Sequence, residues 1–199
     1  MDARETALLT LNACERQVGW SDGALKKQIS AAGLDSRDAA LATQLCAGVL
    51  QNQMLLDFYL AHFSNIPLKR MEGRVVQALR LGAYQMLFLT RVPVSAAVNE
   101  SVKLTRKFSK NPGAAGLVNA VLRSLERGRQ DLTAPTDLST RFSHPQWLVD
   151  VFVRRLGEEG AQALLACHNA EVPTVAQVNT CRATAQQVRE ELAKAGVEA

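Results

Sequence analysis

The stretch LFLTRVPVSAAVNESVKLTRKFSK, residues 87–110, joins an apolar segment to one that is rich in lysine and arginine. Pro93 lacks an amide hydrogen and disfavours a helical backbone at Val92, so a helix that reaches this point must end there. Ser95 can cap a new helix, in which Glu100 suits the positive end of the helix dipole. The stretch therefore predicts two consecutive helices separated by a turn at Pro93.

The helix before this turn is predicted over residues 71–89, and its later turns, ALRLGAYQMLFL, are apolar on nearly every side. Such a helix is typical of the centre of a bundle, where other helices surround it. Aromatic residues make up only 5% of the chain, and alanine and leucine are abundant, which favours helix over sheet. We therefore expect a mainly α fold.

Helical periodicity and capping signals divide the first two thirds of the chain into a series of helices. Besides the two around Pro93, helices are predicted over residues 3–17, 21–29, 35–50, 54–63 and 111–128. Asn111 and Pro112 form a strong helix start, a cap followed by proline at the first position. A bundle of five to seven helices that closes near residue 130 accounts for this pattern.

The chain changes character after residue 130. The segment GRQDLTAPTDLST, residues 128–140, is polar and contains a proline, as a linker does, and we place the linker at 131–141. Two short helices, a strand and a further helix are then predicted over residues 146–156, 158–168, 174–179 and 184–195. Because a strand needs partner strands, we expect residues 142–199 to be the start of an incomplete small α/β domain.

One face of the helix after Pro93 carries cations at the spacing i, i+3, i+4 and i+7. These are Lys103, Arg106, Lys107 and Lys110. At 100° per residue they fall within about 100° of arc, opposite an apolar face. A solvated helix face is the plain alternative, but such faces usually mix charges of both signs, and no acidic residue lies among these four. The pattern favours a surface that meets an anion.

The charge distribution indicates the same part of the chain. Residues 69–129 hold 12 basic and 3 acidic residues, residues 1–68 hold 5 and 7, and residues 130–199 hold 6 and 9. We expect a polyanion to meet this middle segment. The candidate contacts there are Lys69, Arg70, Arg74, Lys103, Arg106, Lys107, Lys110, Arg123 and Arg127.

Several classes of site are not predicted. The four cysteines and three histidines are spread too widely for a metal site, and free thiols are expected instead. The charged N-terminus, MDARETALLT, does not match a signal peptide, and the longest apolar stretch, residues 81–89, is far below the roughly 20 residues that span a bilayer. We expect a soluble, cytoplasmic protein with no membrane partner.

Four segments together carry a family resemblance. They are QLCAGVLQN (44–52), RLGAYQMLFLTRVPVSAAVNESV (80–102), AGLVNAVLR (115–123) and FSHPQWLV (142–149). In this order and at these spacings they resemble the N-terminal half of the bacterial 16S ribosomal RNA cytosine-C5 methyltransferases of the RsmB (Sun, Fmu) type. The first three also resemble the all-helical RNA-binding fold of the antitermination factor NusB.

The resemblance implies a NusB-like RNA-binding domain over residues 1–130, followed by the beginning of a linker domain that precedes a catalytic domain. It implies ribosomal RNA and the protein's own C-terminal methyltransferase domain as partners. It also adds Arg4 to the candidate RNA contacts, because helical relatives have basic residues near the first helix. In the whole protein it implies S-adenosylmethionine as methyl donor and a cysteine that attacks the base at C6 to activate C5.

This chain shows none of that catalytic machinery. No cysteine follows a proline, and the glycine pairs GAAG (113–116) and GEEG (157–160) lie between or within predicted helices. We therefore predict no catalytic, metal-binding or cofactor-binding residue here, and whether the natural protein continues past Ala199 is left open. The family's arginine before valine and asparagine in the predicted strand is replaced by Gln177, so an RNA contact from that strand is not expected.

Three interpretations of the whole stay open. The first is the N-terminal region of a methyltransferase, the second a free-standing NusB-like antitermination regulator, and the third a helical module that binds an acidic protein. Oligomeric state is left open as well. Trp147 is either a platform for a stacked base or an aromatic anchor that docks the C-terminal extension on the bundle, and His144 is expected to be a turn residue.

Overall fold

The computed structural model describes residues 1–16, 21–170 and 175–197. It divides into two compact units, Met1–Asn169 and Ala170–Ala199. Within the described residues the regular structure is helical and no strand is present. The α-helices are α1 (Ala3–Arg16), α2 (Ser21–Ala32), α3 (Ser36–Gln51), α4 (Gln53–Phe63), α5 (Gly73–Phe88), α6 (Val94–Phe108), α7 (Ala114–Gly128), α8 (Leu138–Phe142), α9 (Gln146–Asn169) and α10 (Ala185–Lys194). The 3-10 helices are η1 (Leu68–Arg70) and η2 (Arg129–Asp131).

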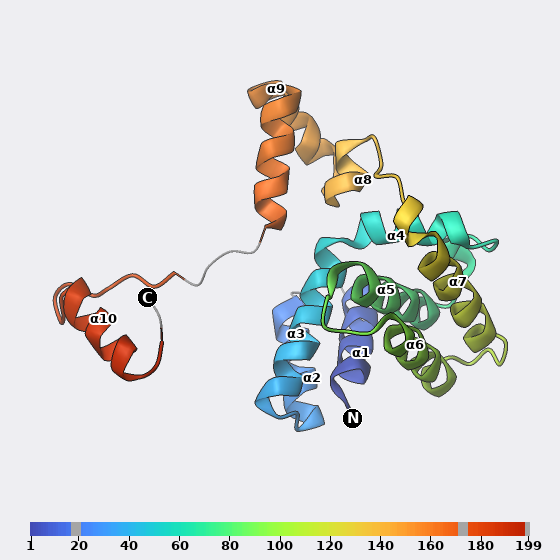
Figure 1. Ribbon diagram of the computed structural model, residues 1–199, viewed down its shortest axis with the longest axis horizontal. Helices are drawn as coiled ribbons and strands as arrows, with labels where there is room; N and C mark the ends of the chain where they lie inside the picture. The colour runs from blue at the N-terminus through green and yellow to red at the C-terminus, as the bar shows by residue number, and fades with distance from the viewer. Residues whose placement is uncertain (17–20, 171–174, 198–199) are drawn as a thin grey trace. The chain divides into compact units, whose positions relative to one another are not determined.

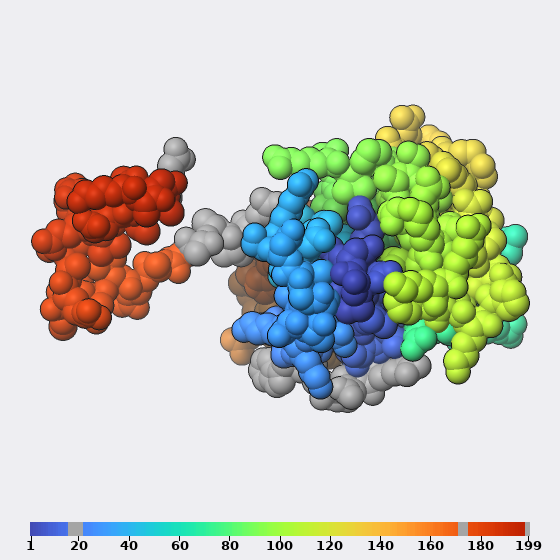
Figure 2. Space-filling view, turned by 90° about the horizontal axis from the view of Figure 1, so that it is seen from below, coloured from blue at the N-terminus to red at the C-terminus, as the bar shows by residue number. Residues whose placement is uncertain are grey.

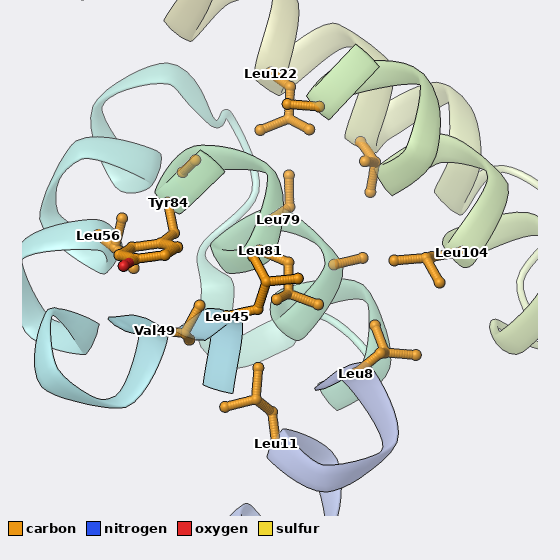
Figure 3. Packing of buried hydrophobic residues seen from close by; sticks show 14 of the residues in the cluster. Leu8, Leu11, Leu45, Val49, Leu56, Leu79, Leu81, Tyr84, Leu104 and Leu122 are labelled. Atoms are coloured by element: carbon orange, nitrogen blue, oxygen red, sulfur yellow. The ribbon is translucent and has the colours of Figure 1, made fainter. Parts of the chain in front are cut away.

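Helix α5 forms the centre of the first unit, as its apolar sequence predicts. Residues 75–86 of this helix are all buried, and α1, α3, α4, α6 and α7 pack around it (Figure 1). Figure 3 shows leucines from α1, α3, α4, α6 and α7 converging on Leu79, Leu81 and Tyr84 of α5. The mainly α bundle expected from the sequence is thus confirmed.

Two glycines allow the helices of this core to approach closely. A Cβ at Gly48 of α3 would come within 1.9 Å of Cζ of Tyr84, so the tyrosine ring lies directly on the backbone of α3. A Cβ at Gly82 of α5 would come within 2.5 Å of Leu122 and 2.7 Å of the Ser101 hydroxyl. Contacts this short leave no room for any side chain at either position.

The sequence predicts separate helices over residues 35–50 and 54–63, and the structure places the break at Asn52, between α3 and α4. Both the amide N–H and the side-chain Nδ2 of Asn52 donate to the carbonyl of Gly48, at 3.1 and 2.9 Å. An asparagine side chain that bonds a local carbonyl competes with helical hydrogen bonding, which accounts for the break. Helix α4 then leaves in a new direction, and its Leu56 and Leu60 are buried in the core.

Two predicted helix starts differ from the observed ones. Helix α6 begins at Val94 with Pro93 in the capping position, so Ser95 is not the cap. The fixed φ of proline suits an extended cap residue, and the Pro93 carbonyl accepts from the amides of Ala96 and Ala97. Helix α7 begins at Ala114, because the side chain of Asn111 accepts from the amide of Gly113 and forms a turn first.

The last part of the first unit consists of α8 and α9. Gly157 has a φ of 73°, so α9 is two helical segments that meet at a non-helical glycine. This confirms the two short helices predicted over residues 146–156 and 158–168. Two hydrogen bonds connect the segment formed by α8 and α9 to the bundle. Leu55 N donates to Ser143 Oγ at 3.2 Å, and Gln51 Nε2 donates to the His168 carbonyl at 3.4 Å.

The second unit contains α10, which begins with a capping box between Thr184 and Gln187 and ends before Gly196 at a φ of 75°. The helix predicted over residues 184–195 is thus confirmed to within a residue at each end. The predicted strand at 174–179 is wrong for residues 175–179, which form no ladder, and Thr174 lies outside the described residues. A strand is defined by pairing, and the described residues offer no second strand to pair with it.

Within the described ranges, no helix has both the length and the apolar character needed to cross a bilayer. The same ranges hold no group of three or more histidine, cysteine or acidic side chains placed to bind a metal ion. The four cysteines are free, with Cys46 buried and Cys167 and Cys181 exposed.

Candidate nucleic-acid interface

Glu72 joins the start of α5 to the end of α6. Its Oε2 accepts from the hydroxyl of Ser109 at 2.7 Å and from the backbone amide of Lys110 at 3.2 Å. Next to it, Nη1 of Arg74 donates to the carbonyl of Phe108 at 3.0 Å, which satisfies a carbonyl at the end of α6. The start of α5 and the segment 108–110 are therefore fixed against each other.

This junction brings together four of the predicted contacts, which we call the η1–α6 edge: Lys69, Arg70, Arg106 and Lys110. Lys69 and Arg70 form the end of η1, three and two residues before Glu72, and Arg106 lies in the last turn of α6. All four side chains are exposed. Within the described part of the chain, none of the four side chains forms an ion pair.

The basic stripe predicted on the helix after Pro93 is not free of acids once the chain is folded. Nζ of Lys103 pairs with Glu100 at 2.7 Å, and Nζ of Lys107 pairs with Glu5 of α1 and lies 5.4 Å from the centre of the Phe108 ring. In Figure 2 the blue α1 lies beside yellow-green α6, which is how Glu5 reaches across. Lys110 lies beyond the end of α6, because Ser109 is extended.

The remaining predicted contacts have partners of their own. Nε of Arg4 donates to Oε1 of buried Gln85 at 2.8 Å. Arg123 pairs with Glu126 at 2.9 Å, and Arg127 donates to the Ser124 hydroxyl at 3.0 Å. Helix α7 runs about 20 Å from Ala114 to Arg127 at 1.5 Å per residue, so the two arginines lie well along α7 from its start near Lys110. The structure therefore divides the ten candidates into the four residues of the η1–α6 edge and six cations with hydrogen-bond or ion-pair partners, of which Arg74 lies beside the edge.

Sequence reasoning missed an ionic network in the core. Nε and Nη2 of Arg80 donate to the two carboxylate oxygens of Asp57, both at 2.7 Å, and Nη1 lies 3.7 Å from Oε1 of Glu15. Gln77 also donates to Glu15, at 3.3 Å. The signal available was a single arginine inside the apolar run ALRLGAYQMLFL, since a buried arginine requires a carboxylate partner.

The C-terminal extension does not dock on the bundle through Trp147. That side chain is 67% exposed, so the prediction that Trp147 anchors the extension is wrong. Hydrogen bonds from α3 and α4 connect the segment formed by α8 and α9 to the bundle instead. His144 is the turn residue expected, with Nδ1 2.7 Å from the Phe142 carbonyl and its amide bonded to the Ser139 carbonyl. A base-stacking role for Trp147 stays a prediction.

The fold and the edge define a class: a small all-helical bundle with a cationic rim, followed by a helical extension. Comparison with known families gives this class a name. The NusB family model matches residues 1–127, and a model described as a ferredoxin-like domain of RsmF/B-like methyltransferases matches residues 144–199. The chain belongs to the NusB family.

Relatives match along almost the whole chain. It is 34% identical over 200 residues to the probable ribosomal RNA small subunit methyltransferase B of Bacillus subtilis, covering 98% of this chain and 44% of that protein. It is 35% identical over 166 residues to the ribosomal RNA small subunit methyltransferase B of Pseudomonas putida, covering 82% and 37%. The chain therefore spans less than half the length of these relatives.

Two solved structures share the fold. The antitermination factors NusB and NusE in complex with double-stranded RNA give a TM-score of 0.59 at 20% identity, covering 63% of this chain and 94% of that one. The crystal structure of PH0851 gives a TM-score of 0.67 at 14% identity, covering 100% of this chain and 46% of that one.

The described residues do not fit an S-adenosylmethionine site. Such a site uses a glycine-rich turn that follows a strand, and the described residues contain no strand. The glycines of GAAG lie at the start of α7, and those of GEEG lie at the bend inside α9. No step of methyl transfer is assigned to the residues described here.

Proposed function

We propose that this chain is the RNA-binding N-terminal region of an S-adenosylmethionine-dependent ribosomal RNA cytosine-C5 methyltransferase. Residues 1–130 bind ribosomal RNA, residues 131–141 connect, and residues 142–199 begin the domain that precedes catalysis. The observation that carries the proposal is the succession of two family matches, NusB and the RsmF/B-like ferredoxin-like domain, in one chain. The catalytic domain and the methyl donor belong to the rest of the protein.

The role of this region is to position ribosomal RNA for that catalytic domain. Exposed cations bind the phosphate backbone without reading base edges, so they supply affinity and orientation more than sequence choice. A target cytosine must leave its stack to be methylated, and an RNA held at a second point is easier to present in that state. The region contributes binding energy and geometry, and the chemistry takes place elsewhere.

A free-standing NusB-like antitermination regulator is the second candidate. It is favoured by the likeness to NusB in the NusB–NusE complex with double-stranded RNA, which covers 94% of that NusB-type chain. That likeness covers 63% of this chain, whereas residues 144–199 match a domain of RsmF/B-like methyltransferases. The methyltransferase interpretation accounts for both parts of the chain.

The mass of the natural protein separates the two candidates. An antibody raised against residues 1–130 is used to detect the protein in its own cells, and a species heavier than 21.6 kDa by a whole domain is expected. Cells that lack the protein are then compared with normal cells by bisulfite sequencing of the small-subunit ribosomal RNA. Loss of one 5-methylcytosine supports the methyltransferase, whereas a protein at the fragment's own mass with unchanged methylation supports the regulator.

A further inference from the structure

We propose that the η1–α6 edge is the surface on which this domain binds the phosphate backbone of ribosomal RNA. This inference rests on the proposed function and makes it specific. Lys69, Arg70, Arg106 and Lys110 contact phosphates, whereas the partnered cations of α6 and α7 contribute little. Six of the ten candidate residues are thereby given structural roles.

Ion pairing is the first reason why the partnered cations of α6 and α7 are expected to contribute little to RNA binding. RNA binding gains free energy when phosphates replace the counterions of free cations, and a lysine that a protein carboxylate already neutralises has few counterions to release. Lys103 and Lys107 are neutralised by Glu100 and Glu5. Glu5 is only 13% exposed, so a phosphate that took its lysine would leave a poorly hydrated carboxylate without a partner.

The geometry of the edge is the second reason. Glu72 fixes the backbone of Lys110 against the start of α5, and η1 ends two residues earlier at Arg70. Lys69 therefore lies within about 10 Å of Glu72, because three residues span at most about 3.4 Å each. The backbone segments that carry the four cations are held near one another before RNA arrives, which lowers the entropy lost on binding. Counting the Glu72 carboxylate and the Arg74 guanidinium at the same junction, the local net charge is +4.

The partner that this surface fits is a backbone of closely spaced phosphates. Flexible lysine and arginine side chains accommodate a polyanion, and the aromatic residue between Arg106 and Lys110, Phe108, packs against the core. The edge is therefore expected to hold RNA with weak sequence preference. A folded region of small-subunit ribosomal RNA supplies such phosphates.

The test compares two variants of equal charge in the full 199-residue chain. The edge variant carries Lys69→Gln, Arg70→Gln, Arg106→Gln and Lys110→Gln. The control variant carries Lys26→Gln, Lys27→Gln, Arg37→Gln and Arg91→Gln, which replace exposed cations on α2, on α3 and in the turn after α5. Circular dichroism confirms that both fold, and filter binding to a transcript of small-subunit ribosomal RNA gives Kd across a range of salt concentrations.

Log affinity falls as log salt rises, and each phosphate contact contributes about 0.7 to 0.9 to the magnitude of this slope. In the edge variant, which lacks four cations, the magnitude of the slope is expected to decrease by about 3. The control variant should keep nearly the wild-type slope. Equal losses in the two variants, or a wild-type slope in the edge variant, would overturn the inference while leaving RNA binding in place. A wild-type chain whose binding shows no salt dependence would instead overturn RNA binding by this region.

Discussion

Arg80 and Asp57 form a bidentate ion pair that links α5 to α4, with both N–O distances at 2.7 Å. The side chain of Arg80 is 7% exposed and that of Asp57 is 31% exposed, so the pair lies at the margin of the core. Glu15 of α1 approaches the same guanidinium, and three helices therefore share one buried cation. The pair holds α4 in the position from which it contacts α5, α7 and α8.

Removing one partner of this pair is expected to destabilise the fold. Asp57→Ala leaves the Arg80 guanidinium with only the longer contact to Glu15, and an uncompensated buried charge costs about 3 kcal/mol of unfolding free energy. Urea unfolding followed by circular dichroism measures the change. Glu159→Ala, at an exposed site on α9, should alter the unfolding free energy by less than about 0.5 kcal/mol. Similar values for the two variants would show that the pair adds nothing to stability.

The contact between Gly48 and Tyr84 predicts a second stability effect. Gly48→Ala places a methyl group where the tyrosine ring now lies, and the overpacked core should lose about 1 to 3 kcal/mol of unfolding free energy. Gly116→Ala is the matched control, because a Cβ at Gly116 meets no atom within 4 Å. In the first turn of α7 that change should be neutral or stabilising, by up to about 1 kcal/mol. A Gly48→Ala chain as stable as wild type would contradict the packing described here.

The helices could be predicted because their signals are local. Pro93 separates α5 from α6, Gly196 follows the end of α10, and the apolar run before Pro93 marks the central helix. The helix starts at Val94 and Ala114 could not be placed to the residue, because proline and asparagine at a cap offer competing hydrogen bonds. The prediction of a strand at residues 174–179 failed because alternating apolar and polar residues only favour an extended backbone. A strand forms only when the segment pairs with another strand.

The candidate interface could be predicted only in outline. The sequence shows that Lys107 carries a charge, but it does not show that Glu5, 102 positions earlier, lies beside it. Nor does it show that Glu72 reaches Ser109 and thereby gathers Lys69, Arg70 and Lys110 at one place. Tertiary contacts decide which cations have a carboxylate partner. The ten predicted residues could therefore be divided into paired and unpaired cations only with the structure.

Burial of Cys46 predicts a thiol that resists modification and a pH effect on stability. Burial raises the pKa of the Cys46 thiol to about 12 from a usual value of 9.0. Because the unfolded thiol loses its proton first, the unfolding free energy should fall as pH rises from 9 toward 12. Cys46→Ala should make that fall shallower, although Cys14 and Tyr59, whose pKa values are also raised by burial, keep part of it.

The same burial is tested by alkylation of the native protein. Iodoacetamide at pH 8 should modify exposed Cys167 and Cys181 within minutes and leave Cys46 intact until the chain unfolds, as peptide mass spectrometry can show. Addition of urea above the unfolding midpoint should make all the thiols react at similar rates. Rapid labelling of Cys46 in the native chain would mean that α1 and α3 separate readily.

The pair between Glu5 and Lys107 provides the last prediction, which concerns RNA binding. If Glu5 neutralises Lys107, then Glu5→Gln frees a further cation one residue from Arg106, and the salt slope of RNA binding should steepen by about 0.7 to 0.9. Glu159→Gln changes the net charge equally but lies on α9, so it should leave the slope unchanged. The measurement is the same filter-binding series with the ribosomal RNA transcript. An unaltered slope in Glu5→Gln would show that Lys107 already binds phosphate in the wild-type chain, and the boundary of the η1–α6 edge would then have to include it.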